Sequence, residues 1–175
     1  MDSHRIFAVD GSKMNLPKEL LLNDYKINNE GAHYPQGLLS CIYNLKTYTI
    51  HDFDLSNKFD ERNLALKHLE KLQEDDIVVY DRGYFSYHML YEHCQRNIHP
   101  IFRLQLGLKN KAVMDFINDE NKSDEIIEYM PSITTKYDLK KRGVTDIELA
   151  PIKIRLIKYQ IKDKIYYLGT TLLDQ

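Results

Sequence analysis

The sequence has few cysteines and no large excess of charge of either sign. Its 175 residues include 2 cysteines, and 24 Lys and Arg stand against 26 Asp and Glu, for a formal net charge of -2. Two cysteines cannot build a disulfide scaffold, so a reduced, cytoplasmic location is expected. The balanced charge leaves no electrostatic signature of nucleic-acid binding over the whole chain, so evidence for such a function must come from particular residues.

Long apolar runs are also absent. No stretch approaches the roughly 20 apolar residues of a membrane span, and no membrane association is expected. Residues 1–5 lack the basic and then apolar order of a secretory signal. Hydrophobic residues make up 43% and charged residues 29%, as in ordinary globular proteins. The length fits one domain that buries roughly 70% of the surface exposed by its unfolded chain.

The first part of the chain begins with strand patterns. Residues 6–9 form a short apolar run, which predicts a buried strand that stops at a turn at Asp10 and Gly11. Residues 38–43 and 48–53 are two further apolar stretches with a short polar connection, and a β-hairpin is the simplest interpretation.

Helical and strand patterns then alternate. Residues 60–74 have helical spacing with Asp60 as the expected N-cap, and residues 77–80 form another short apolar run. Ser86 is the expected cap of a second helix, and residues 100–104 predict a third short strand. The apolar face expected for that second helix consists of Tyr87, Leu90, Tyr91 and Cys94. This order predicts an α/β fold with a mixed sheet and helices packed on it.

The apolar pattern changes character near Gly107, which predicts a division into residues 1–106 and 107–175. In the second part, residues 111–119 predict a short helix. Residues 152–173 alternate apolar and basic side chains and then become apolar, which predicts a long β-hairpin.

Two aspartates are the first candidates for chemistry. Asp10 and Asp81 each follow a predicted buried strand and precede a turn that contains glycine. If the two strands are neighbours, both carboxylates emerge at one edge of the sheet, where α/β enzymes place their sites. Close carboxylates repel each other unless a cation lies between them, and Mg²⁺ takes oxygen ligands. The alternative is that both are turn or capping residues, because Asp is common after strands.

The local sequences around these aspartates carry a family resemblance. Residues 8–12 read Ala-Val-Asp-Gly-Ser, and residues 78–86 read Val-Val-Tyr-Asp-Arg-Gly-Tyr-Phe-Ser. In this order they resemble the DDE transposases of bacterial insertion sequences, and more narrowly the insertion sequence four family. Further agreement, over most of the chain, lies in residues 60–65, in residues 101–104 and in the pattern of residues 154–172.

The resemblance implies a ribonuclease-H-like catalytic core in residues 1–106 and a β-rich insertion in residues 107–175. It implies a reaction that depends on Mg²⁺ or Mn²⁺, in which an activated water cuts a phosphodiester at the transposon end. The freed 3′-hydroxyl would then attack target DNA. Asp10 and Asp81 would be the catalytic metal ligands.

Three basic residues are candidates for DNA binding under this resemblance. Lys13, Arg82 and Arg103 lie in or near the matching motifs, and their side chains can pair with phosphate oxygens. The alternative is an ordinary surface or structural ion pair for each of them.

The sequence departs from the family at the third acid. The family has a Glu on a late helix within a Tyr-Arg-Glu-Lys signature, which these residues do not contain. The glutamates after Asp81 lack that context; they are Glu92, Glu120, Glu125, Glu128 and Glu148. The resemblance therefore predicts a central fragment without the late helix, with weakened metal binding and impaired turnover. A sheet face without its cover predicts self-association, or marginal stability.

Other interpretations remain open at this level. The chain could be an inactive remnant that acts only as a folded module, or a small ribonuclease-H-like nuclease with another third ligand. Cys41 and Cys94 are interpreted as buried packing residues, since neither has a partner at zinc-binding spacing. Five basic residues make the last hairpin either a DNA-facing surface or a solvated face protected by edge lysines; they are Lys153, Arg155, Lys158, Lys162 and Lys164.

Overall fold

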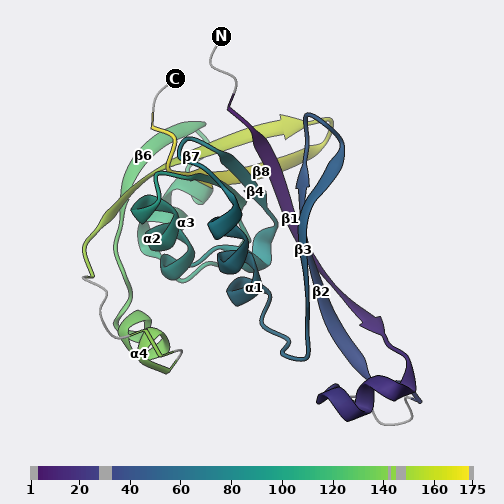
Figure 1. Ribbon diagram of the computed structural model, residues 1–175. Coiled ribbons are helices and arrows are strands. Elements are labelled where there is room, and N and C mark those ends of the chain that lie inside the picture. The colour runs from purple at the N-terminus through teal and green to yellow at the C-terminus, as the bar shows by residue number, and fades with distance from the viewer. Residues whose placement is uncertain (1–3, 28–32, 142, 145–148, 174–175) are drawn as a thin grey trace. The chain divides into compact units, whose positions relative to one another are not determined.

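A computed structural model describes residues 4–27, 33–141, 143–144 and 149–173. The chain forms two compact units, Met1–Asp76 and Ile77–Gln175 (Figure 1). The predicted boundary between residues 106 and 107 concerns catalytic core and insertion, and it stays a prediction.

The first unit is an antiparallel sheet of three strands with a helix packed against it. The strand order is β3-β2-β1, and these strands run side by side in Figure 1. The predicted hairpin and the helix after it are confirmed. The elements are β1 (Ile6–Asn15), the 3-10 helix η1 (Lys18–Asn23), β2 (Gln36–Asn44), β3 (Thr49–Ser56), α1 (Glu61–His68) and the 3-10 helix η2 (Leu69–Lys71).

One face of this sheet is buried beneath α1. Leu38, Ser40 and Ile42 alternate along β2 and are buried, because every second side chain of a strand points to the same face. Leu64, Ala65 and His68 are the buried residues of α1. On the opposite face, Asp10, Cys41 and Phe53 are cross-strand neighbours, and Phe53 is exposed.

Strand β1 is longer than its sequence pattern indicates. The predicted stop at Asp10 and Gly11 is wrong, because β1 continues to Asn15. Asp10 pairs with Cys41 and Gly11 with Ser40 in the register with β2. The neighbouring strand supplies backbone partners beyond Gly11, and this pairing outweighs the local turn preference of Asp-Gly.

The N-cap of α1 is confirmed at Asp60, whose side chain accepts a hydrogen bond of 3.2 Å from the Asn63 backbone N–H. Replacing Asp60 by alanine is expected to lower the free energy of unfolding by about 1 kcal/mol, because an amide of the first turn loses its acceptor. Urea unfolding measures this change. Glu74→Ala, at an exposed position after the helix, is the control and should change stability far less; equal losses would contradict the capping role.

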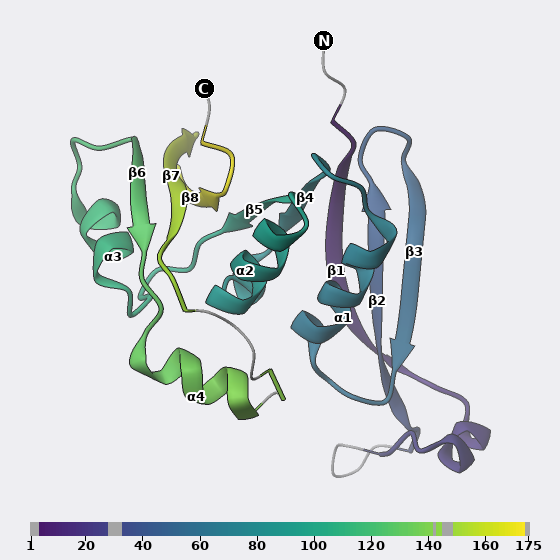
Figure 2. The ribbon, with the colours of Figure 1, turned by 60° about the vertical axis from the view of Figure 1, so that its left-hand side comes forward.

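The second unit contains a mixed sheet in the order β4-β5-β8-β7-β6. Strands β4 and β5 are parallel and are joined through α2, which packs against β5 (Figure 2). The pairs β5-β8, β8-β7 and β7-β6 are antiparallel. The elements are β4 (Ile77–Tyr80), the 3-10 helix η3 (Arg82–Tyr84), α2 (Tyr87–Gln95), β5 (His99–Arg103), α3 (Lys111–Asn118), β6 (Asp124–Tyr129), α4 (Ile133–Lys141), β7 (Ile152–Ile161) and β8 (Lys164–Thr170).

Aromatic side chains fill the core around β4 and β5. The rings of Tyr80 and Phe102 stack with centroids 5.1 Å apart, and Phe85 meets Phe102 edge-on at 5.4 Å. The hydroxyl of Tyr80 lies 3.0 Å from Nε2 of His93, a buried histidine of α2. Ser86 caps α2 as predicted, since its hydroxyl accepts from the Met89 backbone N–H.

The buried face of α2 differs from the prediction. Tyr87 and Leu90 are buried as expected, but Met89 and His93 are the other buried residues of the helix. Because His93 bonds to Tyr80 in the core, the helix turns Cys94 outward, and Cys94 is exposed. Its prediction as a buried packing residue is therefore wrong.

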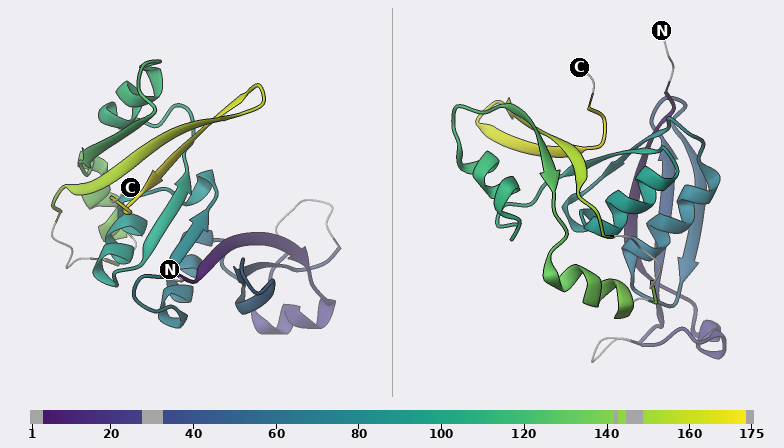
Figure 3. Two further views of the ribbon diagram at one scale, coloured as in Figure 1. Left: turned by 90° about the horizontal axis from the view of Figure 1, so that it is seen from above. Right: turned by 90° about the vertical axis from the view of Figure 1, so that its left-hand side faces the viewer.

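The predicted final hairpin is confirmed as β7 and β8, which project as a long ribbon in Figure 3. Helix α3 packs against β6 and β7 through its buried side chains Val113, Phe116 and Ile117. The sequence patterns did not predict β6 or α4. Among the described helices, none is both long and apolar enough to cross a membrane.

Candidate active site

Asp81 and Arg103 meet at the carboxyl ends of two parallel strands. Tyr80 is paired with Phe102 in the register of β4 and β5, so the next residues along both strands are neighbours. Nη2 of Arg103 lies 2.6 Å from Oδ1 of Asp81. Their side chains are 41% and 56% exposed, and an ion pair so open to solvent adds little to stability. The pair instead holds a carboxylate and a guanidinium together at an accessible strand end.

The surroundings of this pair include exposed residues and one buried donor. Arg82 and Gly83 are exposed in the 3-10 turn after Asp81, whereas Tyr84 is buried. Nε of Arg103 is buried and has no acceptor among the described residues. A buried N–H without an acceptor is uncommon, and it is suited to an incoming anion.

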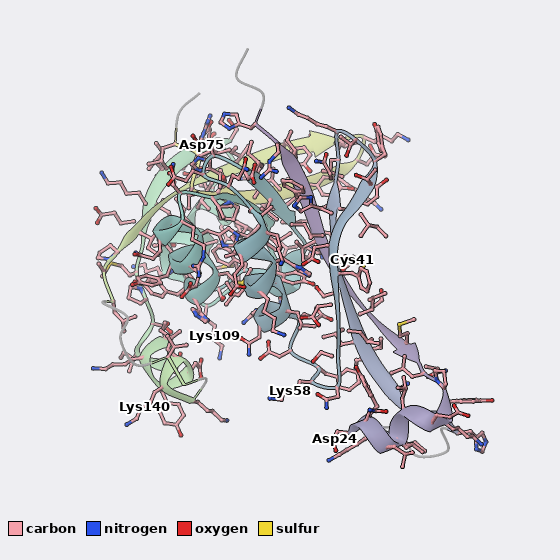
Figure 4. The ribbon with its side chains drawn as sticks, in the orientation of Figure 1. Asp24, Cys41, Lys58, Asp75, Lys109 and Lys140 are labelled. Atoms are coloured by element: carbon pink, nitrogen blue, oxygen red, sulfur yellow. The ribbon has the colours of Figure 1, made fainter. Side chains whose placement is uncertain are left out.

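Asp10 lies in the first unit, exposed on β1 and opposite Cys41 of β2, which Figure 4 labels. Burial, followed by the negative charges of Asp10 and Asp52, raises the pKa of the Cys41 thiol. Cys41 therefore stays protonated beside Asp10 and adds no charge there. Its side chain is only partly buried, so its prediction as a buried packing residue is wrong as well.

Lys13 also lies on β1, three positions after Asp10. Because the side chains of a strand alternate between faces, Asp10 and Lys13 point to opposite faces of the sheet. Nζ of Lys13 lies 5.3 Å from the ring centroid of Phe59, and the lysine is exposed. The first unit therefore does not bring these two predicted site residues together.

The aspartates suit a hard divalent cation by their chemistry. Carboxylate oxygens are the ligands that Mg²⁺ accepts, and each unit supplies one predicted ligand, Asp10 or Asp81. Within the described parts of the chain, no group of three or more His, Cys, Asp or Glu side chains could hold a metal ion. Glu92 forms an ion pair with Arg96, its Oε1 lies 3.5 Å from Nε2 of His88, and Glu148 lies outside the described residues.

The family of the chain follows from its match to a protein-family model. Residues 2–170 match the model described as the transposase DDE domain. The chain belongs to the transposase DDE domain family. The predicted ribonuclease-H-like α/β core with a mixed sheet and flanking helices is confirmed for this DDE domain. The narrower placement in the insertion sequence four family stays a prediction.

Solved structures of a transposase and of an endonuclease are similar to this chain to different degrees. A piggyBac transposase, in a synaptic complex with hairpin DNA, has a TM-score of 0.53 and 9% sequence identity. The match covers 97% of the DDE domain chain but only 34% of the piggyBac chain. Endonuclease V of Ciona intestinalis, bound to inosine-containing DNA, has a TM-score of 0.39 and 10% identity, covering 95% of this chain and 70% of its own. No curated protein matches the sequence.

The sequence patterns missed one buried polar network in the DDE domain. Nε2 of His68 lies 3.1 Å from the Ser40 hydroxyl, and Nδ1 of His68 lies 3.2 Å from Oδ2 of Asp52. This is the connectivity of a Ser-His-Asp triad, but Ser40 and His68 are 0% and 1% exposed, so no substrate reaches the hydroxyl. The network links β2, α1 and β3. Its sequence signal is Ser40 itself, a hydroxyl on the buried face that needs a partner.

Proposed function

We propose that this DDE domain catalyses phosphodiester hydrolysis and strand transfer in DNA transposition, with Mg²⁺ or Mn²⁺ held by Asp10 and Asp81. The observation that carries the proposal is the exposed carboxylate of Asp81, paired with Arg103 at the carboxyl ends of two parallel strands. A bound metal would activate water and stabilise the charge that develops on the phosphate.

The proposed DNA contacts are Arg103, Arg82 and Lys13. Arg103 has the strongest support, because its buried Nε would gain an acceptor from a phosphate oxygen while Nη2 keeps Asp81 in place. Arg82 and Lys13 are supported by their exposure. The proposed partners are transposon ends and target DNA. Self-association stays a prediction. The side chains of Ile50 and Phe53 are 63% and 64% exposed and provide apolar surface for it.

Turnover by a polypeptide of these 175 residues is expected to be impaired. By the family resemblance it would supply two of three acidic ligands, Asp10 and Asp81, and with fewer charged ligands a site holds its cation more weakly. Metal binding and catalysis are therefore measured separately.

Metal binding is tested by titrating the protein with Mn²⁺ and following paramagnetic broadening of its amide NMR signals. Broadening is expected first at Gly11 and at Arg82 and Gly83, which adjoin the two aspartates. Asp81→Asn should weaken Mn²⁺ binding by about tenfold or more, because a charged ligand is lost. Asp138→Asn removes an exposed carboxylate of α4 and is the matched control. If Asp81→Asn titrates like the parent, Asp81 is not a ligand.

Catalysis is tested by incubating the protein with supercoiled plasmid and Mn²⁺. Nicking that requires both Asp10 and Asp81 supports the proposed reaction. Metal binding without any cleavage would instead favour the interpretation of a non-catalytic folded module.

A further inference from the structure

The structure divides the basic residues of the last hairpin into two groups. Nε of Arg155 donates to Oδ1 of Asp124 at 2.8 Å, and Nζ of Lys158 donates to the backbone carbonyl of Asp119 at 2.8 Å. Nζ of Lys158 also lies over the Phe116 ring, 5.4 Å from its centroid. These two cations therefore serve contacts within the unit. The exposed basic residues are Lys153, Lys162 and Lys164.

Two tyrosines lie side by side on one face of the same hairpin. Tyr159 of β7 is directly opposite Tyr166 of β8, and their rings stack with centroids 5.3 Å apart and planes at 17°. The next pair on this face toward the turn is Ile161 and Lys164. We call the two tyrosines with Lys164 the tyrosine platform.

The platform belongs to a two-stranded part of the sheet. Strand β6 pairs with β7 only as far as Ile157, so Tyr159 and Tyr166 lie beyond its end. The other face of the hairpin turns Lys158 toward α3, where it contacts Phe116. Tyr159 remains 36% exposed and Ile161 53% exposed.

We propose that the tyrosine platform binds unpaired DNA by stacking a nucleobase on the exposed ring surface, with Lys164 and Lys162 beside the adjacent phosphates. Aromatic rings stack with any base, and basic side chains next to them track the phosphate backbone of a single strand. Edge lysines that block aggregation would account for the cations but not for the stacked tyrosines, of which Tyr159 is exposed and Tyr166 half-buried. The choice of DNA as ligand rests on the proposed function, whereas the platform geometry does not.

The test measures binding of a labelled single-stranded oligonucleotide of about 16 nucleotides by fluorescence anisotropy, at low salt and in EDTA. The chelator removes any contribution of a metal at Asp81, so a failure here is distinct from a failure of the metal site. The double variant Tyr159→Ala/Tyr166→Ala should bind about tenfold to a hundredfold more weakly. Tyr159→Phe/Tyr166→Phe should bind like the parent, because the ring faces remain.

Matched controls come from exposed tyrosines on other elements. Tyr48→Ala and Tyr137→Ala, at positions 76% and 71% exposed, should leave binding unchanged. Lys164→Gln should weaken binding and reduce its salt dependence. The proposal is overturned if the alanine pair binds like the parent, if the phenylalanine pair loses as much as the alanine pair, or if the duplex of the same sequence shows an equal loss.

A second measurement does not depend on the folding of the alanine variant. An oligonucleotide that carries 5-iodouracil is crosslinked to the parent protein, and the modified residue is identified by mass spectrometry. Crosslinks at Tyr159 or Tyr166 support the platform. Crosslinks confined to other residues overturn it.

Discussion

Replacing Arg5 by alanine is expected to lower the free energy of unfolding of the first unit by about 2–3 kcal/mol. The Asp76 side chain is only 4% exposed, and its carboxylate accepts from Nε of Arg5 at 2.8 Å and from Nη2 at 2.5 Å. Without Arg5, the donor that remains to this buried charge among the described residues is the Gln73 backbone N–H, at 2.7 Å. Because the Arg5 side chain itself is 34% exposed, we expect less than the full loss of a wholly buried pair.

Urea unfolding measures the loss of stability, which is compared with the losses in two further variants. Arg5→Ala/Asp76→Asn should recover part of the stability, since the uncompensated charge is then absent. Lys67→Ala breaks the pair with Asp54, whose side chains are 63% and 32% exposed, and should change stability by less than about 1 kcal/mol. If Arg5→Ala lowers the free energy of unfolding no more than Lys67→Ala does, the burial of Asp76 does not increase the contribution of the Arg5–Asp76 pair to stability.

Stability is expected to fall as the pH is lowered from 6.5 toward 4, because of His93. Burial lowers the pKa of His93 from 6.5 to about 4, with smaller contributions from Arg96 and His99 in the same direction. The neutral ring fits its bonds, since Nδ1 can donate to the Met89 carbonyl at 2.6 Å while Nε2 accepts from Tyr80.

The sign follows from proton binding. Between pH 6.5 and about 4 the unfolded chain binds a proton at His93 that the folded chain does not, so unfolding becomes easier as pH falls. At 1.36 kcal/mol per pH unit, the loss over this range is about 3 kcal/mol. Above pH 6.5 both states carry a neutral ring, and this contribution to stability no longer changes with pH.

The measurement is a series of urea unfolding curves from pH 7.5 to 4. His93→Gln keeps an amide donor and acceptor but does not titrate, so its stability should be lower at neutral pH and fall less steeply with acid. Other groups contribute equally to both proteins, and the difference between the two profiles isolates His93. Parallel profiles would mean that the histidine does not control acid stability.

The elements that sequence patterns predicted correctly are those with local signals. A short connection between two apolar stretches was enough for the β2–β3 hairpin, and side-chain caps at Asp60 and Ser86 placed the starts of α1 and α2. The β7–β8 hairpin had clear alternation. In each case the residues that stabilise the element are close in sequence.

The incorrect or missing predictions concern features that depend on contacts between residues distant in sequence. The end of β1 moved to Asn15 because β2 pairs with it past Asp10. Strand β6 reads Asp-Glu-Ile-Ile-Glu-Tyr, which does not alternate strictly between polar and apolar residues, and it is held by its pairing with β7. The outward position of Cys94 follows from the bond between His93 and Tyr80, which the helical period does not reveal.

The sequence by itself determined the family, because Asp-Gly-Ser and Asp-Arg-Gly-Tyr are contiguous motifs whose order can be read directly. The same motifs gave Asp10 and Asp81 as predicted metal ligands. Only the tertiary structure decided that Arg103 pairs with Asp81 and that Tyr159 stacks on Tyr166. It also decided which hairpin cations remain exposed. The physical reason is strand register: a shift of one residue moves every side chain to the other face, and register is set by pairing between strands, not by the pattern within one.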